Sequence, residues 1–140
     1  MSMDFDGHKF YPLSDAERRK VEMPRIDKNI YSRENGWAIS AFTVLYSATG
    51  DEKYLKPAEK AARWIIANRS LPEGGFRHGE KDLSGPFLAD TLYMAQALLN
   101  LYEASGDRAW LAKSVEAANF IDKNFTDKEN GGFKTNASPA

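Results

Sequence analysis

The sequence has no cysteine, only two histidines, and no apolar stretch long enough to cross a membrane. The missing cysteines exclude a disulfide scaffold, thiol catalysis and zinc fingers, and two histidines exclude a histidine-rich metal site. We therefore expect no metal and no cofactor. A membrane span needs roughly 18 or more apolar residues in a row, and residues 1–10 are too polar for a signal peptide. These absences predict no membrane partner and a cytoplasmic location.

Excess charge of either sign is missing as well. The 140 residues carry 19 Lys plus Arg and 20 Asp plus Glu, for a formal net charge of −1. Nucleic-acid binding proteins usually concentrate positive charge, so this balance argues against a nucleic-acid partner. A chain of this length typically forms one domain, so we expect residues 1–140 to form a single unit with its own core.

An internal repeat organises the chain. The segment from Leu45 to Asp51, LYSATGD, recurs 56 positions later as LYEASGD from Leu101 to Asp107. The same spacing relates Trp64 to Phe120, and one inserted residue relates Gly-Gly-Phe at 74–76 to Gly-Gly-Phe at 131–133. This period is longer than that of tetratricopeptide or ankyrin repeats, which excludes both. The sequence therefore predicts two copies of one larger structural unit.

Each copy has the pattern of a helical hairpin. We expect first helices at about 37–49 and 88–105, and second helices at about 52–68 and 108–124. Gly50 and Gly106 are typical of a left-handed helix end, and the Asp after each can cap the next helix. Pro57 should distort the second helix or delay its start to about residue 56. A further helix is expected at 14–21, where Ser14 and Glu17 have capping-box spacing.

The two kinds of helix differ in polarity, which assigns them to layers. The second helices carry one apolar stripe opposite charged residues, as expected for an outer layer. The first helices are apolar almost all round, so they need neighbours on most sides and should form an inner layer. The sequence thus predicts an all-α fold of antiparallel helical hairpins.

Several short motifs in this order resemble one family. They are Asp27-Lys28-Asn29, Glu34-Asn35-Gly36-Trp37, Gly50-Asp51 with Tyr54-Leu55, Gly74-Gly75-Phe76-Arg77-His78, Leu88-Ala89-Asp90, Leu101-Tyr102 and Gly131-Gly132-Phe133. Together they resemble the helical toroid region of the thioredoxin-domain-containing, spermatogenesis-associated proteins, which is similar to N-acylglucosamine 2-epimerases and six-hairpin glycosidases. The resemblance implies an arc of an (α/α)6 toroid.

The chain also departs from that family. It has no Cys-x-x-Cys motif, so a redox role does not transfer, and only two hairpins are recognisable. Two hairpins cannot close a ring of six. We therefore expect either the remainder of a longer chain or a homo-oligomer to cover the inner helices, because large exposed apolar patches normally have a partner. Within the single domain we expect an N-terminal helix and loop at 11–35, hairpin repeats at 36–76 and 77–133, and a frayed tail at 134–140.

The longer connections should gather on one face, beside the first turns of the inner helices, where oxygen-rich ligands are favoured. The resemblance implies a sugar ligand there. Catalytic candidates are His78, Asp82 and Asp90, as a general base for epimerisation or as paired carboxylates for glycoside hydrolysis. The predicted substrate-binding residues are Arg33, Asn35, Trp37, Arg77 and Tyr93.

Structural roles compete with each of these assignments. His78 could be solvated, Asp90 a helix cap, and Trp37 and Tyr93 core aromatics. At the level of function, the leading hypothesis is a carbohydrate-active domain that binds or transforms a sugar at the long-loop face. The alternative is a non-catalytic oligomerising or protein-interaction module.

Overall fold

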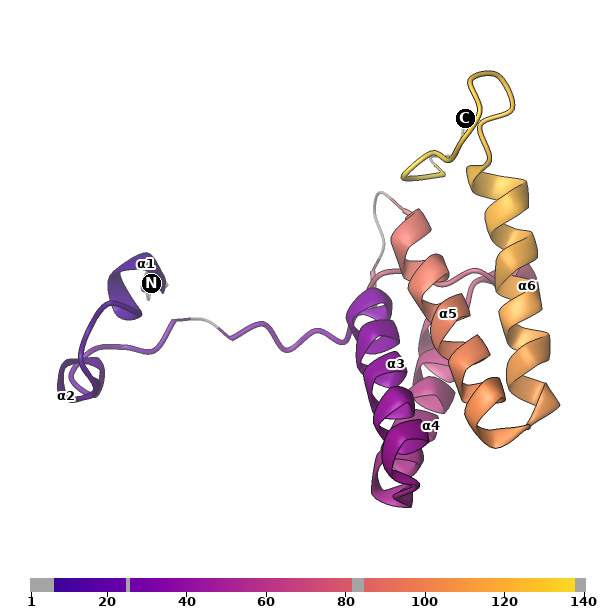
Figure 1. The fold of residues 1–140 in the computed structure, drawn as a ribbon. Coiled ribbons are helices and arrows are strands. Elements are labelled where there is room, and N and C mark those ends of the chain that lie inside the picture. The colour runs from indigo at the N-terminus through magenta and orange to yellow at the C-terminus, as the bar shows by residue number, and fades with distance from the viewer. Residues whose placement is uncertain (1–6, 25, 82–84, 138–140) are drawn as a thin grey trace.

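The computed structural model describes residues 7–24, 26–81 and 85–137, and the described part is all-α. Two short helices, α1 (Gly7–Phe10) and α2 (Asp15–Arg18), lie apart from four long ones (Figure 1). The long helices are α3 (Ser32–Thr49), α4 (Glu52–Arg69), α5 (Leu88–Ser105) and α6 (Arg108–Phe125), and a 3-10 turn, η1 (Pro72–Gly74), follows α4. The predicted hairpins are thus α3 with α4 and α5 with α6.

The turns inside the two hairpins have the predicted chemistry. Gly50 and Gly106 end α3 and α5 in the left-handed conformation, with φ of 68° and 72°. Their N–H groups donate to the carbonyls of Tyr46 and Tyr102, both at 2.7 Å. The side chains of Asp51 and Asp107 then accept from the backbone N–H two residues on, both at 2.9 Å. Each turn therefore closes one helix and opens the next within two residues.

Two predicted helix limits are wrong, those of the first inner helix and of the N-terminal helix. Helix α3 begins at Ser32 rather than near residue 37, because groups far away in the sequence satisfy its first N–H donors. Helix α4 begins at Glu52, as predicted, and contains Pro57, so the alternative of a later start near residue 56 does not occur. The N-terminal helix is confined to Asp15–Arg18, although Glu17 does accept from the Ser14 N–H at 2.9 Å.

The core lies where the two hairpins meet. Helix α3 packs against α4 and α5, and α5 packs against α6. The inner helices contribute Ile39, Met94, Leu98 and Leu101, and α4 adds its predicted stripe through Ala58, Ala62 and Ile65. All seven are at most 1% exposed. The far side of α3 remains uncovered by the described residues, and its large apolar side chains there are exposed: Trp37, Phe42, Val44 and Leu45.

The segments after the two hairpins also repeat each other. Ser70 pairs with Phe76 in an isolated antiparallel bridge, and Thr126 pairs with Phe133 in the same way. Beyond each bridge the chain runs back to the start of an inner helix: the Ser32 N–H donates to His78 O at 3.0 Å, and the Leu88 N–H to Thr135 O at 2.9 Å. Residues 134–137, expected in a frayed tail, are therefore held by backbone hydrogen bonds.

Gly36 sets the distance between the two inner helices. A Cβ atom at this position would lie 2.7 Å from the carbonyl oxygen of Tyr93 and 2.8 Å from its carbonyl carbon. Both atoms belong to the backbone of α5, so neither can rotate away. We expect Gly36→Ala to lower the free energy of unfolding by about 1–3 kcal/mol, as overpacking does. Urea denaturation of both proteins measures the difference.

The same substitution is normally favourable in a helix, where alanine is better than glycine by about 1 kcal/mol. Ala38→Gly on the exposed side of α3 is the matched control and should cost about that amount. A Gly36→Ala variant as stable as the parent protein would contradict the close approach of α3 and α5.

Candidate functional site

The carboxylate of Asp90 joins the first turns of the two inner helices. Asp90 is only 1% exposed and lies in the first turn of α5. Its Oδ1 accepts from the backbone N–H of Arg33, in the first turn of α3, at 3.0 Å. The same oxygen lies 2.9 Å from Nδ1 of His78. Asp90 therefore caps the neighbouring helix, which differs from the simple interpretation as a cap of its own helix.

The ring of His78 is held in one orientation by its neighbours. It stacks on Tyr31 with ring centroids 4.3 Å apart and planes 15° from parallel, and Phe87 meets it edge-on at 6.2 Å. Because a carboxylate only accepts, the contact with Asp90 assigns the proton of the neutral imidazole to Nδ1. The lone pair is then on Nε2. This arrangement is the usual one for a histidine that exchanges protons.

Tyr31 is itself fixed by the preceding loop. Its hydroxyl donates to Oδ2 of Asp27 at 2.7 Å, and this hydrogen bond raises the pKa of Tyr31 above its ordinary value. Asp27 also accepts from the Asn29 N–H at 2.9 Å. Asp27 thus positions the aromatic ring that stacks on His78.

Arg33 and Glu34 add a pair of opposite charges to the same end of α3. Arg33 Nη2 lies 2.6 Å from Oε1 of Glu34. Burial raises the pKa of Glu34, but the hydrogen bonds and positive charge of Arg33 outweigh it, so the net pKa is below the usual value. The other oxygen, Oε2, is buried and finds no hydrogen-bond partner among the described residues. A carboxylate in this state stays ionised and can accept one further donor.

Two aromatic residues lie one turn below this cluster. The rings of Trp37 and Tyr93 meet edge to face at 5.1 Å, and the guanidinium of Arg33 lies 5.2 Å from the Trp37 ring centre. Trp37 is 47% exposed, so within this chain it is not a core residue. An exposed aromatic face beside hydrogen-bonding groups suits the C–H face of a sugar ring.

The remaining predicted residues are placed elsewhere. Asn35 donates from Nδ2 to the carbonyl of Tyr31 at 2.7 Å, and Arg77 donates from Nη2 to the carbonyl of Asn68 at 2.9 Å. Both therefore bind backbone near the site. Asp82 lies outside the described residues. The structure thus brings Arg33, His78 and Asp90 together, with Trp37 and Tyr93 close by.

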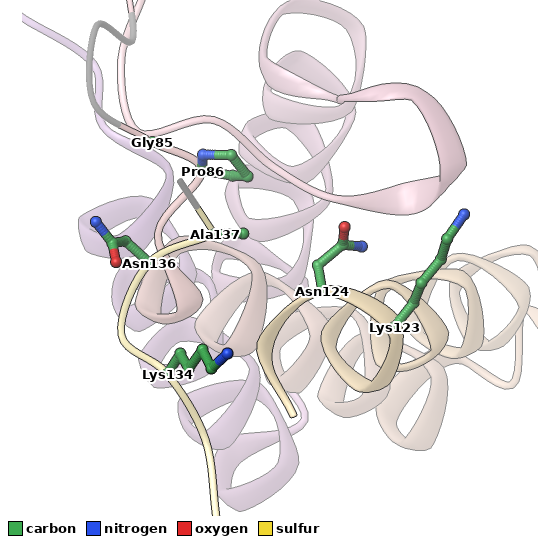
Figure 2. A pocket seen from close by; sticks show the side chains of 7 residues that line it. All are labelled: Gly85, Pro86, Lys123, Asn124, Lys134, Asn136 and Ala137. Carbon is green, nitrogen blue, oxygen red and sulfur yellow. The ribbon is translucent and has the colours of Figure 1, made fainter. Parts of the chain in front are cut away.

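Two cavities border His78. One of about 430 Å³ is lined by Arg33, His78, Phe87, Ala89, Asp90 and Thr135. Another of about 470 Å³ is lined by Asn29, Tyr31, His78, Gly79, Glu80 and Lys81. A larger hollow of about 610 Å³ lies apart from the cluster, between α6 and the C-terminal segment; Figure 2 shows Lys123 and Asn124 on one side of it and Lys134 and Asn136 on the other. None of the predicted site residues that the structure describes lines this larger hollow.

Sequence reasoning missed the aromatic residues that enclose His78. Tyr31 and Phe87 each directly precede an inner helix, and they are related by the repeat spacing of 56. Thr135, which lines the first cavity, takes the place in the second repeat that His78 takes in the first, since each accepts the first N–H of an inner helix. The repeat was therefore the signal that could have identified all three residues.

Across residues 7–24, 26–81 and 85–137, no three His, Asp or Glu side chains gather in a way that could hold a metal ion. In the same part of the chain, no helix combines the length and apolar character that crossing a membrane requires.

Comparisons with known proteins identify the family. The model of Glycosyl Hydrolase Family 88 matches residues 37–135. Spermatogenesis-associated protein 20 of Homo sapiens is 27% identical over 129 residues, which cover 83% of this chain and 16% of that protein. The unsaturated glucuronyl hydrolase of Formosa agariphila is 26% identical over 137 residues, which cover 90% of this chain and 34% of that enzyme. The chain thus spans about a sixth to a third of these relatives.

The fold has a close match among solved structures. The cellobiose 2-epimerase of Spirochaeta thermophila superposes with a TM-score of 0.72 at 19% identity, over 84% of this chain and 32% of the epimerase. The predicted arc of an (α/α)6 toroid is thereby confirmed, as is the resemblance to the spermatogenesis-associated proteins. Since the family model matches most of its length, the chain belongs to Glycosyl Hydrolase Family 88.

Proposed function

We propose that the cluster at the first turns of α3 and α5 binds a sugar, and that His78 exchanges a proton with it. The hydrogen bond between the buried Asp90 and the partly exposed His78 is the observation that carries this proposal. A histidine oriented by a buried carboxylate and enclosed by two aromatic rings loses little freedom when a substrate arrives, and preorganisation of this kind favours proton transfer. Asp90 then serves as a positioning residue.

Arg33 and Trp37 supply the binding contacts in this proposal. Glu34 remains ionised and orients Arg33, whose guanidinium only donates and can bind sugar oxygens. Trp37 and Tyr93 offer apolar surface one turn lower. Relatives act on glucuronyl compounds or cellobiose, as their names state, so sugars of those two kinds are the natural first ligands to test.

A reaction that begins with proton abstraction by His78 fits the described groups better than hydrolysis by two carboxylates. Asp90 is engaged with His78 and the Arg33 N–H, and Glu34 with Arg33. Hydrolysis would need one carboxyl group free to protonate the leaving oxygen.

Binding can be tested by nuclear magnetic resonance on the isotope-labelled chain. We expect D-glucuronate or cellobiose to shift the backbone amide signals of Arg33, Gly79 and Asp90, with saturation as the sugar concentration rises. His78→Ala should weaken the fitted affinity at least about tenfold, a typical effect of losing a strong polar contact. The matched control is His8→Ala in α1, which should leave the affinity unchanged.

If His78→Ala and His8→Ala bind both sugars equally well, His78 has no part in binding. If no signal of the cluster shifts with either sugar, the proposed function is wrong for this chain.

The exposed side of α3 favours a second candidate function, an assembly module. Phe42, Val44 and Leu45 are 38%, 62% and 43% exposed, so this part of α3 presents an apolar patch to the solvent. Such a patch usually meets another protein surface. On this alternative, His78→Ala would leave self-association unchanged, whereas a charge at Phe42 would abolish it.

A further inference from the structure

The turn that follows the first hairpin, residues 70–76, packs into a depression on the second hairpin. We call this turn the knob and the depression its seat. In this seat the backbone of α6 at Glu116 and the ring of Phe120 lie so close to Gly74 and Gly75 that added Cβ atoms would approach to 2.7 Å and 2.4 Å. The Phe76 N–H donates to Oγ1 of Thr91 at 3.0 Å. Phe76 itself is only 2% exposed. The knob is thus anchored by close packing and by one hydrogen bond to α5.

An ionic contact adds to this packing. Lys123 on α6 lies 2.7 Å from Oε2 of Glu73, which is part of the knob. Helix α6 and η1 are in direct contact along this edge. Only glycine therefore fits at positions 74 and 75, because a side chain at either position would hold the knob away from α6.

The first hairpin carries the equivalent seat, and there it is an apolar groove of about 560 Å³. Its lining includes Asn35, Lys60, Trp64 and Ala67. A spacing of 56 relates these residues to Thr91, Glu116, Phe120 and Lys123, which are the residues that hold the knob in the second hairpin. Nothing in the described chain fills this groove.

The second hairpin carries the equivalent knob, residues 126–133, and this knob is unpacked. Its backbone pairing matches that of the first, because the Asp127 N–H donates to Gly132 O as the Leu71 N–H does to Gly75 O. Around Gly131 and Gly132, however, no described atom lies within 4 Å of an added Cβ, and Phe133 is 61% exposed. Figure 1 shows this yellow segment projecting beyond the end of α6.

Equivalent residues of the two inner helices also differ in burial. Met94, Ala97, Leu98 and Leu101 of α5 are fully buried where the two hairpins meet. Their equivalents 56 positions earlier are all exposed in α3: Ala38, Ala41, Phe42 and Leu45. The exposed face of the first hairpin is therefore equivalent, by the repeat, to the face of the second hairpin that packs against the first hairpin.

We propose that the 126–133 knob of one copy docks in the α3–α4 groove of a second copy, so that copies join head to tail. Both complementary surfaces belong to this chain, which is why a second copy is the occupant we choose. The Phe133 N–H would meet the Oδ1 of Asn35, whose amide nitrogen is already engaged with Tyr31 O. The repeat places Ala67 where the second hairpin has Lys123, so the exposed Glu129 would lie beside Ala67 without an equivalent of the Glu73–Lys123 ion pair.

This contact is heterologous, because a different surface is used on each partner, and repetition closes it into a ring. Each copy supplies two hairpins, and the toroid of the related structures has six. Three copies therefore complete the ring. In this ring, the C-terminal end of the 126–133 knob of one copy would lie beside the first turn of α3 in the next copy.

Two single variants test this geometry by light scattering after gel filtration. Phe133→Asp removes the knob and keeps the groove, and Ala67→Trp fills the groove and keeps the knob; both positions are exposed, so folding should be retained. The parent protein should elute at three times the 15.7 kDa chain mass, and each variant alone at a single chain mass. Mixed in equal amounts, the two variants should form a complex of two chains, because one intact knob can meet one intact groove.

Val115→Asp is the control, since it replaces an exposed apolar residue on α6 outside both surfaces and should leave the mass unchanged. A parent protein that remains a single chain at all concentrations would overturn the proposal and assign the groove to a different partner. An assembly that survives both variants, or a mixture that stays monomeric while the parent protein associates, would also overturn it.

Discussion

Phe76→Ala is expected to lower the free energy of unfolding by about 3–5 kcal/mol, the usual cost of removing a buried phenylalanine side chain. Phe76 is 2% exposed and belongs to the main core cluster, with residues of α4, α5 and α6. Its loss would leave a cavity under the knob and weaken the contact between the two hairpins. Urea denaturation followed by circular dichroism, at a protein concentration where the chain is monomeric, measures the change.

Phe133→Ala is the matched control, since the repeat places the same residue type in the same backbone pairing. Phe133 is 61% exposed, so its truncation should change the stability of the monomer by no more than about 0.5 kcal/mol. Equal losses for the two variants would show that the second knob is also packed within a single chain, contrary to the structure.

Asp90→Ala is expected to cost about 2–3 kcal/mol of stability and to abolish the orientation of His78. The substitution leaves the Arg33 N–H without its acceptor, and an unsatisfied buried donor costs about 1–3 kcal/mol. His78 loses the same partner and with it the fixed position of its ring proton. Denaturation measures the first effect, and the loss of sugar-dependent shifts at Gly79 measures the second.

Two comparisons separate these effects. Asp90→Asn keeps an acceptor oxygen for the Arg33 N–H, so it should recover part of the stability but none of the negative charge that faces His78. Asp107→Ala removes an exposed capping carboxylate at α6 and should cost about 1 kcal/mol, with no effect on sugar binding. An Asp90→Ala variant as stable as Asp107→Ala would mean that the Asp90 contacts contribute little.

The hairpins were predictable from the sequence because their signals are local. Gly50 and Asp51 close one helix and start another through bonds that span only a few residues, and the apolar stripe of α4 needs only helical geometry. The start of α3 was not predictable in this way. Its first donors are satisfied by His78 and Asp90, which follow them by 46 and 57 positions and become neighbours only after the hairpins pack.

The same distinction applies to the candidate site. The correct face could be predicted, since the long loops and the first turns of the inner helices must lie together. Which residues meet there could not, because a side chain such as Arg77 or Asn35 can turn to nearby backbone carbonyls instead. The link from Asp90 to His78 depends on the register of α5 against α3, which close packing at Gly36 determines.

The short turns at Gly50 and Gly106 lie at the opposite end of the helices from His78 and Asp90. Nothing lies within 4 Å of a Cβ added at either glycine among the described atoms. Since the native chain has no thiol, Ser47→Cys near this end of α3 would create a unique attachment point. A molecule tethered there to a sensor chip would present every copy with its loop-bearing end toward the solution, ready for a passing analyte.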